Sequence, residues 1–448
     1  MEKICDRIYI DNSRRILIKV DEQGALLLNN DCNFIKFINS QIESYQVNNY
    51  MQKVLSITPN IATKAEFLLS NKCNMGCIYC YSYESRNKNT ISFKQAASVI
   101  DKLIVNSNIK NLINGRKRRI YLSFHGGGEP SCEFALLQSI VEYAKGETAK
   151  NHTELYLEIT TNLSQNNDEI LKYYLDNRFF IHVSMDGIEN VQNYQRPFCD
   201  GSKSFSLVEH NICYLANHGA KFSIRFTITD FSIAFSVDSV TYIKKKFPNV
   251  LFIKLAPLEI TEQSYKHIIN PPKIEDFINV LEEVALLPWN DESEYLSVFG
   301  ETDFLSNCGM CASARFEQMI ISPEGIITTC HEDPLSNDFS YGKVSKEGII
   351  EIDNDKVKLL KKNQCETIQT GKCADCAFRS LCMGGCKHRM SAPNGEMFCA
   401  IQKHTLSKHI KRAFDKKSIN DIGAEYKRIQ YSTAERKSII EIILLRSV

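Results

Sequence analysis

Between residues 63 and 259, short apolar runs alternate with longer segments in which apolar residues recur at helical spacing. This alternation is typical of repeated βα units around a parallel sheet. It predicts six strands, a number that both a partial (β/α)6 barrel and an open doubly wound sheet accommodate. In either fold the functional loops follow the C-terminal ends of the strands. The expected strands are 63–70, 119–124, 155–161, 179–185, 221–229 and 250–258, and amphipathic helices are expected at 92–105 and 205–218.

The chain on either side of this α/β region has a different pattern. Short runs at 7–10, 15–20 and 25–28 predict antiparallel strands, with a turn at 22–24 and a helix over 33–45. Residues 261–289 predict a proline-bearing, partly helical connector. Residues 406–448 alternate basic and apolar residues at helical spacing, which predicts a docked helix with one face in solvent. The predicted organisation is an accessory module at 1–62, the βα region at 63–260, a connector at 261–300, a cysteine-rich domain at 301–405 and a helical tail at 406–448.

Composition and charge are those of a globular chain. Of the 448 residues, 43% are hydrophobic, and 54 Lys and Arg are balanced by 53 Asp and Glu. No unbroken apolar stretch is long enough to span a membrane, and the balanced charge gives no reason to expect a nucleic-acid partner. The N-terminus carries Lys3, Asp6 and Arg7 where a secretion signal would have an apolar core, so we expect a cytoplasmic protein.

The 17 cysteines are the unusual feature of the composition. In a reducing cytoplasm, closely spaced cysteines indicate metal binding rather than disulfides. The first group, Cys73, Cys77 and Cys80, has the spacing C-x3-C-x2-C and directly follows the first predicted strand. Three thiolates can hold three irons of a [4Fe-4S] cluster and leave the fourth iron open to a ligand. A zinc site would need a fourth ligand nearby, and the next cysteine is Cys132.

Polar residues follow the next three predicted strands. The second strand leads through His125 into Gly126-Gly127-Gly128-Glu129-Pro130. Glycines let a backbone approach a ligand closely and a carboxylate beside them can accept from an ammonium group, although a glycine run alone is more often a tight turn. The third and fourth strands end in Thr160-Thr161-Asn162 and Ser184-Met185-Asp186-Gly187, where Asp186-Gly187 could also be a simple turn. We expect these polar strand ends to line the same opening of the predicted βα fold.

The cysteine loop, with Tyr79 before its third cysteine, and the Gly-Gly-Glu segment resemble the radical S-adenosylmethionine (SAM) superfamily. This resemblance implies a partial (β/α)6 barrel of the TIM type. It also implies that the open iron binds SAM, whose reductive cleavage gives a 5′-deoxyadenosyl radical that abstracts a hydrogen atom from a substrate. The residues that the resemblance places near SAM are Gly127, Gly128, Glu129, Thr160, Asn162, Ser184, Asp186 and Arg196.

The C-terminal cysteines have two further spacings. Cys311, Gly325 and Cys330 read C-x13-G-x4-C, and the run from Cys373 to Cys386 reads C-x2-C-x5-C-x3-C, followed by Cys399. In isolation the C-x2-C pairs would favour a zinc ribbon. The whole series resembles the SPASM domain of radical SAM enzymes that act on peptides. That resemblance implies two fully ligated auxiliary [4Fe-4S] clusters, one held by Cys308, Cys311, Cys330 and Cys386 and the other by Cys373, Cys376, Cys382 and Cys399.

Together these resemblances imply an enzyme that modifies a peptide or protein substrate, with SAM, three [4Fe-4S] clusters and an electron donor such as flavodoxin or ferredoxin. We favour a maturase of ribosomally made peptides that forms a thioether, carbon–carbon or related crosslink. The alternative is an anaerobic sulfatase-maturating enzyme, which forms formylglycine. Members of that group carry Asp after the cysteine equivalent to Cys330, whereas this chain has His331. His331 and Asp333 are candidate general bases.

Two alternatives remain open from the sequence. The N-terminal module could recognise a leader peptide by adding it to a strand edge, or it could merely cover the barrel. A protein of another class, a non-catalytic electron-transfer or zinc-ribbon protein, would use the same cysteines structurally. That class predicts no open iron and no role for the Gly-Gly-Glu segment.

Overall fold

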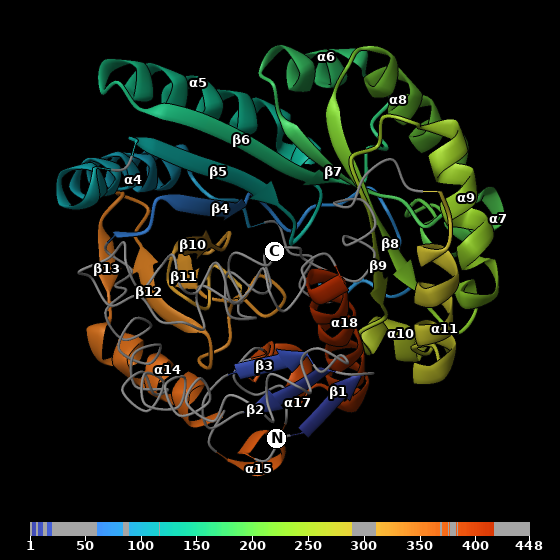
Figure 1. The fold of residues 1–448 in the computed structure, drawn as a ribbon. Helices are drawn as coiled ribbons and strands as arrows, with labels where there is room; N and C mark the ends of the chain where they lie inside the picture. Colours follow the sequence, from blue (N-terminus) through green and yellow to red (C-terminus); the bar gives the residue numbers. More distant parts are fainter. Residues whose placement is uncertain are drawn as a thin grey trace.

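The computed structural model describes residues 2–5, 8–11, 16–19, 61–83, 89–115, 117–288, 311–367, 370–374, 376, 382 and 384–415. Six parallel strands, neighbours in chain order, form a curved sheet (Figure 1). They overlap the six predicted strands, and their sequential order fits a partial barrel rather than a doubly wound sheet, which reverses its strand order. The strands are β4 (Lys64–Leu68), β5 (Arg119–His125), β6 (Glu154–Thr161), β7 (Phe180–Ser184), β8 (Lys221–Ile228) and β9 (Ile253–Pro257).

Helices cover the outer face of this curved sheet (Figure 1). Strand β8 shows why, since Phe222, Ile224 and Phe226 are fully buried while the alternate residues Arg225 and Thr227 are only half-buried. One face of the strand therefore packs under helices and the other faces the barrel interior. The helices are α4 (Phe93–Asn114), α5 (Phe134–Lys150), α6 (Asp168–Asp176), α7 (Glu189–Gln195), α8 (Phe205–Asn217) and α9 (Ser236–Lys246), with short 3-10 helices η2 (Pro130–Glu133) and η3 (Ser232–Phe235).

The sheet continues past the barrel into the cysteine-rich region. Strand β10 (Gln318–Ile321) pairs in parallel with β4, and β11 (Ile326–Thr328), β12 (Ser340–Val344) and β13 (Ile350–Ile352) extend the sheet in antiparallel fashion. All ten strands form one sheet, in the order β13-β12-β11-β10-β4-β5-β6-β7-β8-β9. The sequence alone suggested a separate domain here, but backbone pairing joins it to the barrel beside the cysteine loop.

Two local contacts fix this junction. Gly325 turns the chain between β10 and β11 with φ 84°, and a Cβ at this position would overlap the Val344 carbonyl oxygen. Gln95 in the first turn of α4 forms a capping box with Ser92 and donates from Nε2 to the Val344 carbonyl oxygen at 2.8 Å. The start of α4 and the end of β12 are therefore tied together.

The remaining elements flank the open side of the barrel. The connector contains α10 (Glu262–Lys266) and α11 (Ile274–Ala285), as predicted partly helical. Helix α18 (Gly395–Asp415) includes the start of the predicted tail, and His404 and Lys408 both contact Glu282 of α11, at 2.8 and 2.6 Å. The other helices here are α14 (Asn354–Thr367), α15 (Gly371–Ala374) and α17 (Lys387–Ser391). No helix among the described residues has both the length and the apolarity to cross a membrane.

The N-terminal strands form a three-stranded antiparallel sheet. It consists of β1 (Glu2–Cys5), β2 (Ile8–Asp11) and β3 (Ile16–Lys19), with β2 central. Strands β2 and β3 match the predicted runs, and β1 was not predicted. The strand expected at 25–28, the turn at 22–24 and the helix at 33–45 lie outside the described residues.

Candidate active site

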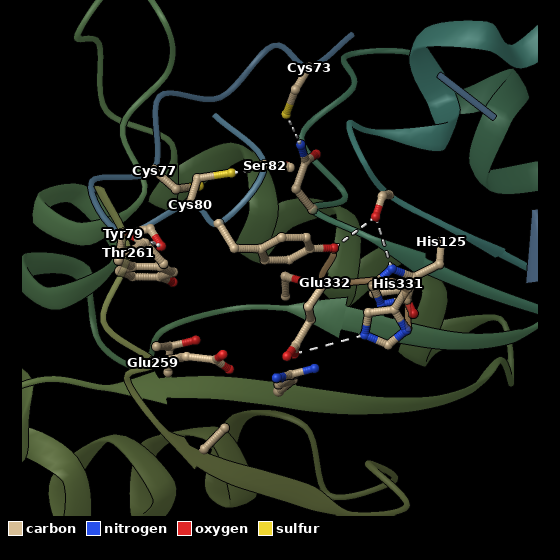
Figure 2. A pocket seen from close by; sticks show the side chains of 18 of the residues that line it. Cys73, Cys77, Tyr79, Cys80, Ser82, His125, Glu259, Thr261, His331 and Glu332 are labelled. Carbon is tan, nitrogen blue, oxygen red and sulfur yellow. Dashed lines mark hydrogen bonds and ion pairs between the residues drawn. The ribbon is translucent and has the colours of Figure 1, made fainter. Parts of the chain in front are cut away.

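A cavity of about 180 Å³ lies at the C-terminal ends of the barrel strands. Its lining comes from the cysteine loop, the strand ends and the C-terminal region (Figure 2). The structure thus brings together most of the residues predicted for the site. Those that line the cavity are Cys73, Cys77, Cys80, Gly127, Gly128, Glu129, Thr160, Thr161, Asn162, Ser184, Arg196 and His331.

None of the three cysteines of the loop is in a disulfide, and each has a polar neighbour. The Asn162 side-chain amide lies 3.9 Å from Cys73 Sγ, Arg196 Nη1 lies 3.9 Å from Cys77 Sγ, and the Ser82 hydroxyl lies 3.3 Å from Cys80 Sγ. The Asn162 and Arg196 donors stabilise the thiolate forms of Cys73 and Cys77, and the thiolate is the form that binds metal. Three thiols on one loop, facing a cavity, therefore fit an iron–sulfur cluster with one open iron.

The glycine segment packs directly against this loop. The backbone N–H of Gly128 donates to the Ser70 carbonyl at 2.9 Å, and that of Glu129 donates to the Lys72 carbonyl at 2.7 Å. A Cβ on Gly127 would overlap the Asn71 side chain, and a Cβ on Gly128 would overlap the Lys72 carbonyl oxygen. Glycine is required at Gly128 because two backbones meet there, so the segment is more than a tight turn.

Glu129 is 3% exposed and firmly held. Its Oε1 accepts from the Ser131 N–H at 3.1 Å, the Ser131 hydroxyl at 2.7 Å and the Thr161 hydroxyl at 2.7 Å, while Oε2 accepts only from the Asn162 N–H, at 2.7 Å. Burial raises the pKa of Glu129, and these hydrogen bonds partly offset that effect. Because a carboxylate oxygen can accept two hydrogen bonds, Oε2 keeps capacity for a cationic ligand.

Asp186 lies behind the cavity wall rather than in it. It is fully buried, and its carboxylate accepts from the Thr227 N–H at 3.0 Å and from the hydroxyl of Tyr79, and forms an ion pair with Arg196 Nε at 3.0 Å. Burial alone would lower the pKa of Arg196, but Asp186 raises it above its ordinary value. The guanidinium also lies 5.3 Å from the centre of the Tyr79 ring. Asp186 therefore orients Arg196, which lines the cavity.

At the end of the cavity away from the cysteine loop, His331 is the only lining residue that the sequence predicted for the site. Its Nδ1 lies 2.9 Å from Glu66 Oε1, and its ring stacks on His125 with centroids 4.4 Å apart. Despite burial, the charge of His331 lowers the pKa of Glu66 to about 2, and Glu66 raises the pKa of His331. Burial and His331 together lower the pKa of His125 to about 4. The ligand atoms of Glu66, His125 and His331 lie close enough together to hold a divalent ion, and Glu66 is already paired with His331.

A second charged group completes this end of the cavity. Arg389 Nη2 lies 3.1 Å from Glu332 Oε1 and its Nε lies 3.5 Å from Glu259 Oε2, while His388 Nε2 lies 2.6 Å from Glu259 Oε1. Figure 2 shows Glu259, Glu332 and His331 away from the three cysteines. Glu259 follows the sixth strand, a position that the strand-end rule could have identified. Asp333, the other predicted base, does not line the cavity.

The C-terminal cysteines gather in two groups. Burial and the charges of Cys399, Cys376 and Cys373 raise the pKa of Cys382 to about 12, which shows that these four thiols are neighbours. Burial raises the pKa of Cys386 as well, and Cys311 adds to this effect. The pKa of Cys330 is also raised, first by burial and in smaller part by Cys386. None of these seven cysteines is in a disulfide, and Cys308 lies outside the described residues.

Comparisons with known proteins agree with this arrangement. Residues 67–233 match the model of the Radical SAM superfamily. A cysteine-type anaerobic sulfatase-maturating enzyme of Clostridium novyi (strain NT) is 23% identical over 360 residues, covering 77% of this chain and 94% of that protein. The structure of anSMEcpe with bound AdoMet and Cp18Cys peptide has a TM-score of 0.60 at 18% identity, covering 79% of this chain and 99% of that one. Streptococcus suis SuiB bound to precursor peptide SuiA has a TM-score of 0.51 at 13% identity, covering 88% and 97%.

Over residues 67–233 the chain matches the radical SAM superfamily. It is related to sulfatase-maturating enzymes and to peptide-modifying enzymes of that superfamily. The superfamily implies SAM and a [4Fe-4S] cluster as cofactors. The predicted partial barrel is confirmed by the six parallel strands and by the fold shared with both solved structures.

Proposed function

We propose that Cys73, Cys77 and Cys80 hold the open [4Fe-4S] cluster and that SAM lies over the glycine segment. The support is that three closely spaced cysteines, the backbone of Gly127 and Gly128, and a carboxylate with spare acceptor capacity line one cavity. Thr160, Asn162, Ser184 and Arg196 would complete the SAM site, with Asp186 acting through Arg196. When bound, the cluster and SAM supply a 5′-deoxyadenosyl radical for hydrogen abstraction.

The chain's own residues bind and orient the reactants in this proposal. Glu129 Oε2 accepts a hydrogen bond from an ammonium group, and the donors of Asn162 and Arg196 stabilise the thiolates of Cys73 and Cys77. His331 faces the cavity, and its pairing with Glu66 increases its affinity for a proton, as a general base requires. Asp333 remains a weaker candidate because it does not line the cavity.

We propose further that the two C-terminal cysteine groups hold auxiliary clusters that accept electrons. The neighbouring thiols Cys373, Cys376, Cys382 and Cys399 would hold one cluster, and Cys311, Cys330 and Cys386 would hold the other together with Cys308. Four thiolates per cluster leave no site for substrate. Their role would therefore be to remove an electron as a crosslink or an oxidised side chain forms.

The substrate class that we propose is a peptide, matured to a natural product by formation of a crosslink. The observation that carries this proposal is the cavity itself, which joins the cysteine loop to a second region rich in charged side chains from the C-terminal part of the chain. One end would hold SAM and leave the other for a polar substrate. Two solved structures that share this fold contain bound peptides, which supports a peptide as the substrate.

A direct test is anaerobic reconstitution followed by reduction with dithionite in the presence of SAM. The wild-type protein is expected to form 5′-deoxyadenosine and to contain about twelve irons per chain, four for each cluster. A variant with Cys73, Cys77 and Cys80 replaced by Ala should retain about eight irons and form no 5′-deoxyadenosine. Equal product from wild type and variant would favour the non-catalytic alternative.

Sulfatase maturation is a second candidate, favoured by the similarity to the Clostridium novyi enzyme. His331 in place of the Asp typical of that group argues against it. The two are separated by incubating the active enzyme with sulfatase-derived peptides that contain Cys or Ser and testing for an aldehyde. Formylglycine in either peptide would establish sulfatase maturation, whereas its absence alongside 5′-deoxyadenosine formation favours the crosslinking maturase.

A further inference from the structure

The charges at the far end of the cavity are almost fully paired. Glu66 pairs with His331, Glu259 with His388 and Arg389, and Glu332 with Arg389. At the other end, Arg196 pairs with Asp186. Each of these carboxylates therefore already has a cationic or imidazole partner.

Arg225 is the exception among the described cationic side chains that line the cavity. It lies on the interior face of β8, in register with Ser184 of β7 and Lys254 of β9. In the part of the chain that the structure describes, no carboxylate lies within ion-pair distance of its guanidinium, and its side chain makes no hydrogen bond. The half-buried side chain thus brings to the cavity a positive charge that has no direct ion-pair partner among the described residues.

The surroundings of Arg225 make that charge costly. Burial lowers the pKa of Arg225, and the neighbouring positive charge of Arg389 lowers it further, with Glu332 only partly offsetting this. The pKa of Arg389, in contrast, is raised because Glu332 and Glu259 outweigh its burial. A shielded guanidinium without an anion is unfavourable unless a ligand supplies the anion.

We propose that Arg225 binds a carboxylate of the peptide substrate, so that the enzyme selects a peptide with an Asp or Glu beside the modified residue. The inference rests on the proposed function. A guanidinium presents a planar pair of donors that matches a carboxylate, and a peptide supplies carboxylates on its side chains. The carboxylate of SAM is the other possible source, but Arg225 feels Arg389, Glu332 and Tyr81 more strongly than it feels Arg196 of the predicted SAM site.

The test uses the full-length, anaerobically reconstituted protein loaded with SAM. The probes are two pools of short acetylated, amidated peptides of random sequence that are alike except for a central Glu or a central Gln. Retention by the protein in ultrafiltration is measured by mass spectrometry. Wild type is expected to retain the Glu pool about ten-fold better than the Gln pool, because only the Glu carboxylate forms a charge-assisted hydrogen-bonded pair with the guanidinium.

Substitutions of Arg225 identify the group responsible. Arg225→Gln should retain both pools alike, Arg225→Lys should keep a weaker preference for Glu, and Arg225→Glu should prefer a matched pool with a central Lys. The matched control is Arg119→Gln, which changes an arginine at the opposite end of the barrel, on the first residue of β5, and should behave as wild type.

SAM binding to the same proteins separates the two sources of carboxylate. The proposal predicts that Arg225→Gln binds SAM within about two-fold of wild type and keeps its iron, because the interaction removed is with the peptide. A loss of SAM binding in Arg225→Gln, with or without loss of the peptide preference, would overturn the proposal, as would a wild type without preference. If Arg225→Gln loses iron, Arg225→Lys is used in its place. A weaker preference of Arg225→Lys for the Glu pool then supports the proposal, and an unchanged preference contradicts it.

The proposed function can fail separately. A wild type that forms no 5′-deoxyadenosine contradicts the radical SAM reaction. A wild type that forms it but retains the Glu and Gln pools equally contradicts only the role of Arg225.

Discussion

Glu66 Oε1 lies 2.9 Å from His331 Nδ1, and this contact joins the first barrel strand to the C-terminal region. Glu66 is also held by Gln318, whose side-chain amide donates to Oε2 at 2.9 Å. Because β4 and β10 are neighbouring strands, the pair sits where the barrel and the cysteine-rich region share a sheet. The contact therefore links the stability of that junction to the charge state of His331.

The first prediction concerns the pH dependence of this pair. The pKa of His331 is raised in the folded protein above the 6.5 of an unfolded chain, while Glu66, with a pKa of about 2, stays ionised. The stabilisation is then fully present between pH 4.5, the ordinary pKa of a glutamate, and pH 6.5, and it is lost as pH rises through the folded pKa of His331. Glu66→Gln should therefore lower the free energy of unfolding by about 1 to 3 kcal/mol near pH 6 and by less near pH 9.

Glu158→Gln is the matched control, because Glu158 pairs with Lys64 at 2.8 Å and a lysine ammonium ordinarily keeps its charge across this range. Anaerobic thermal unfolding at both pH values provides the comparison. An equal effect of Glu66→Gln at pH 6 and pH 9 would contradict the link to His331.

The second prediction concerns the glycine segment. Gly128→Ala should abolish SAM cleavage, lowering 5′-deoxyadenosine formation by about 100-fold or more, because the new Cβ would overlap the Lys72 carbonyl oxygen and move the cysteine loop. Gly146→Ala is the control, since a Cβ there meets nothing within 4 Å and lies within α5. This control should keep its activity and gain about 0.5 to 1 kcal/mol of stability. Comparable activity in the two variants would show that the segment does not need glycine.

The third prediction concerns the buried carboxylate behind the cavity wall. Asp186→Asn leaves Arg196 without its anion and should lower the free energy of unfolding by about 3 kcal/mol. SAM affinity should fall as well, because Arg196 loses its orientation. Asp176→Asn, at the exposed end of α6, should change stability by less than about 0.5 kcal/mol. Denaturant unfolding and equilibrium SAM binding measure both effects, and an unchanged SAM affinity would separate Asp186 from the SAM site.

The fourth prediction concerns the auxiliary clusters. Cys386→Ser and Cys382→Ser should each lose about four irons per chain, because each thiol belongs to a different group. Cys213→Ser provides the control, since Cys213 lies on α8, away from both groups, and its iron content should equal that of wild type. Iron is measured after anaerobic reconstitution. Retention of full iron by Cys386→Ser would remove this residue from the proposed ligands.

The sequence by itself determined the barrel and one end of the cavity. Alternating apolar runs specify the strands, and the carboxyl ends of neighbouring parallel strands must meet, so the cysteine loop, the glycine segment and Asn162 could be placed together in advance. The spacing of Cys73, Cys77 and Cys80 is equally local, since one loop carries all three thiols. Local patterns could not place Asp186, which lies on a strand end but turns its carboxylate inward to Arg196.

Only the tertiary structure decided the other end of the cavity. Glu66 and His331 come from distant segments, and no periodicity in the chain indicates that they meet. Their meeting depends on β10 pairing with β4, a choice of strand neighbour that is made by backbone hydrogen bonds and packing over the whole sheet. A pattern of apolar and polar residues records which side of a strand is buried, whereas the partners of a charge follow from the assembled fold.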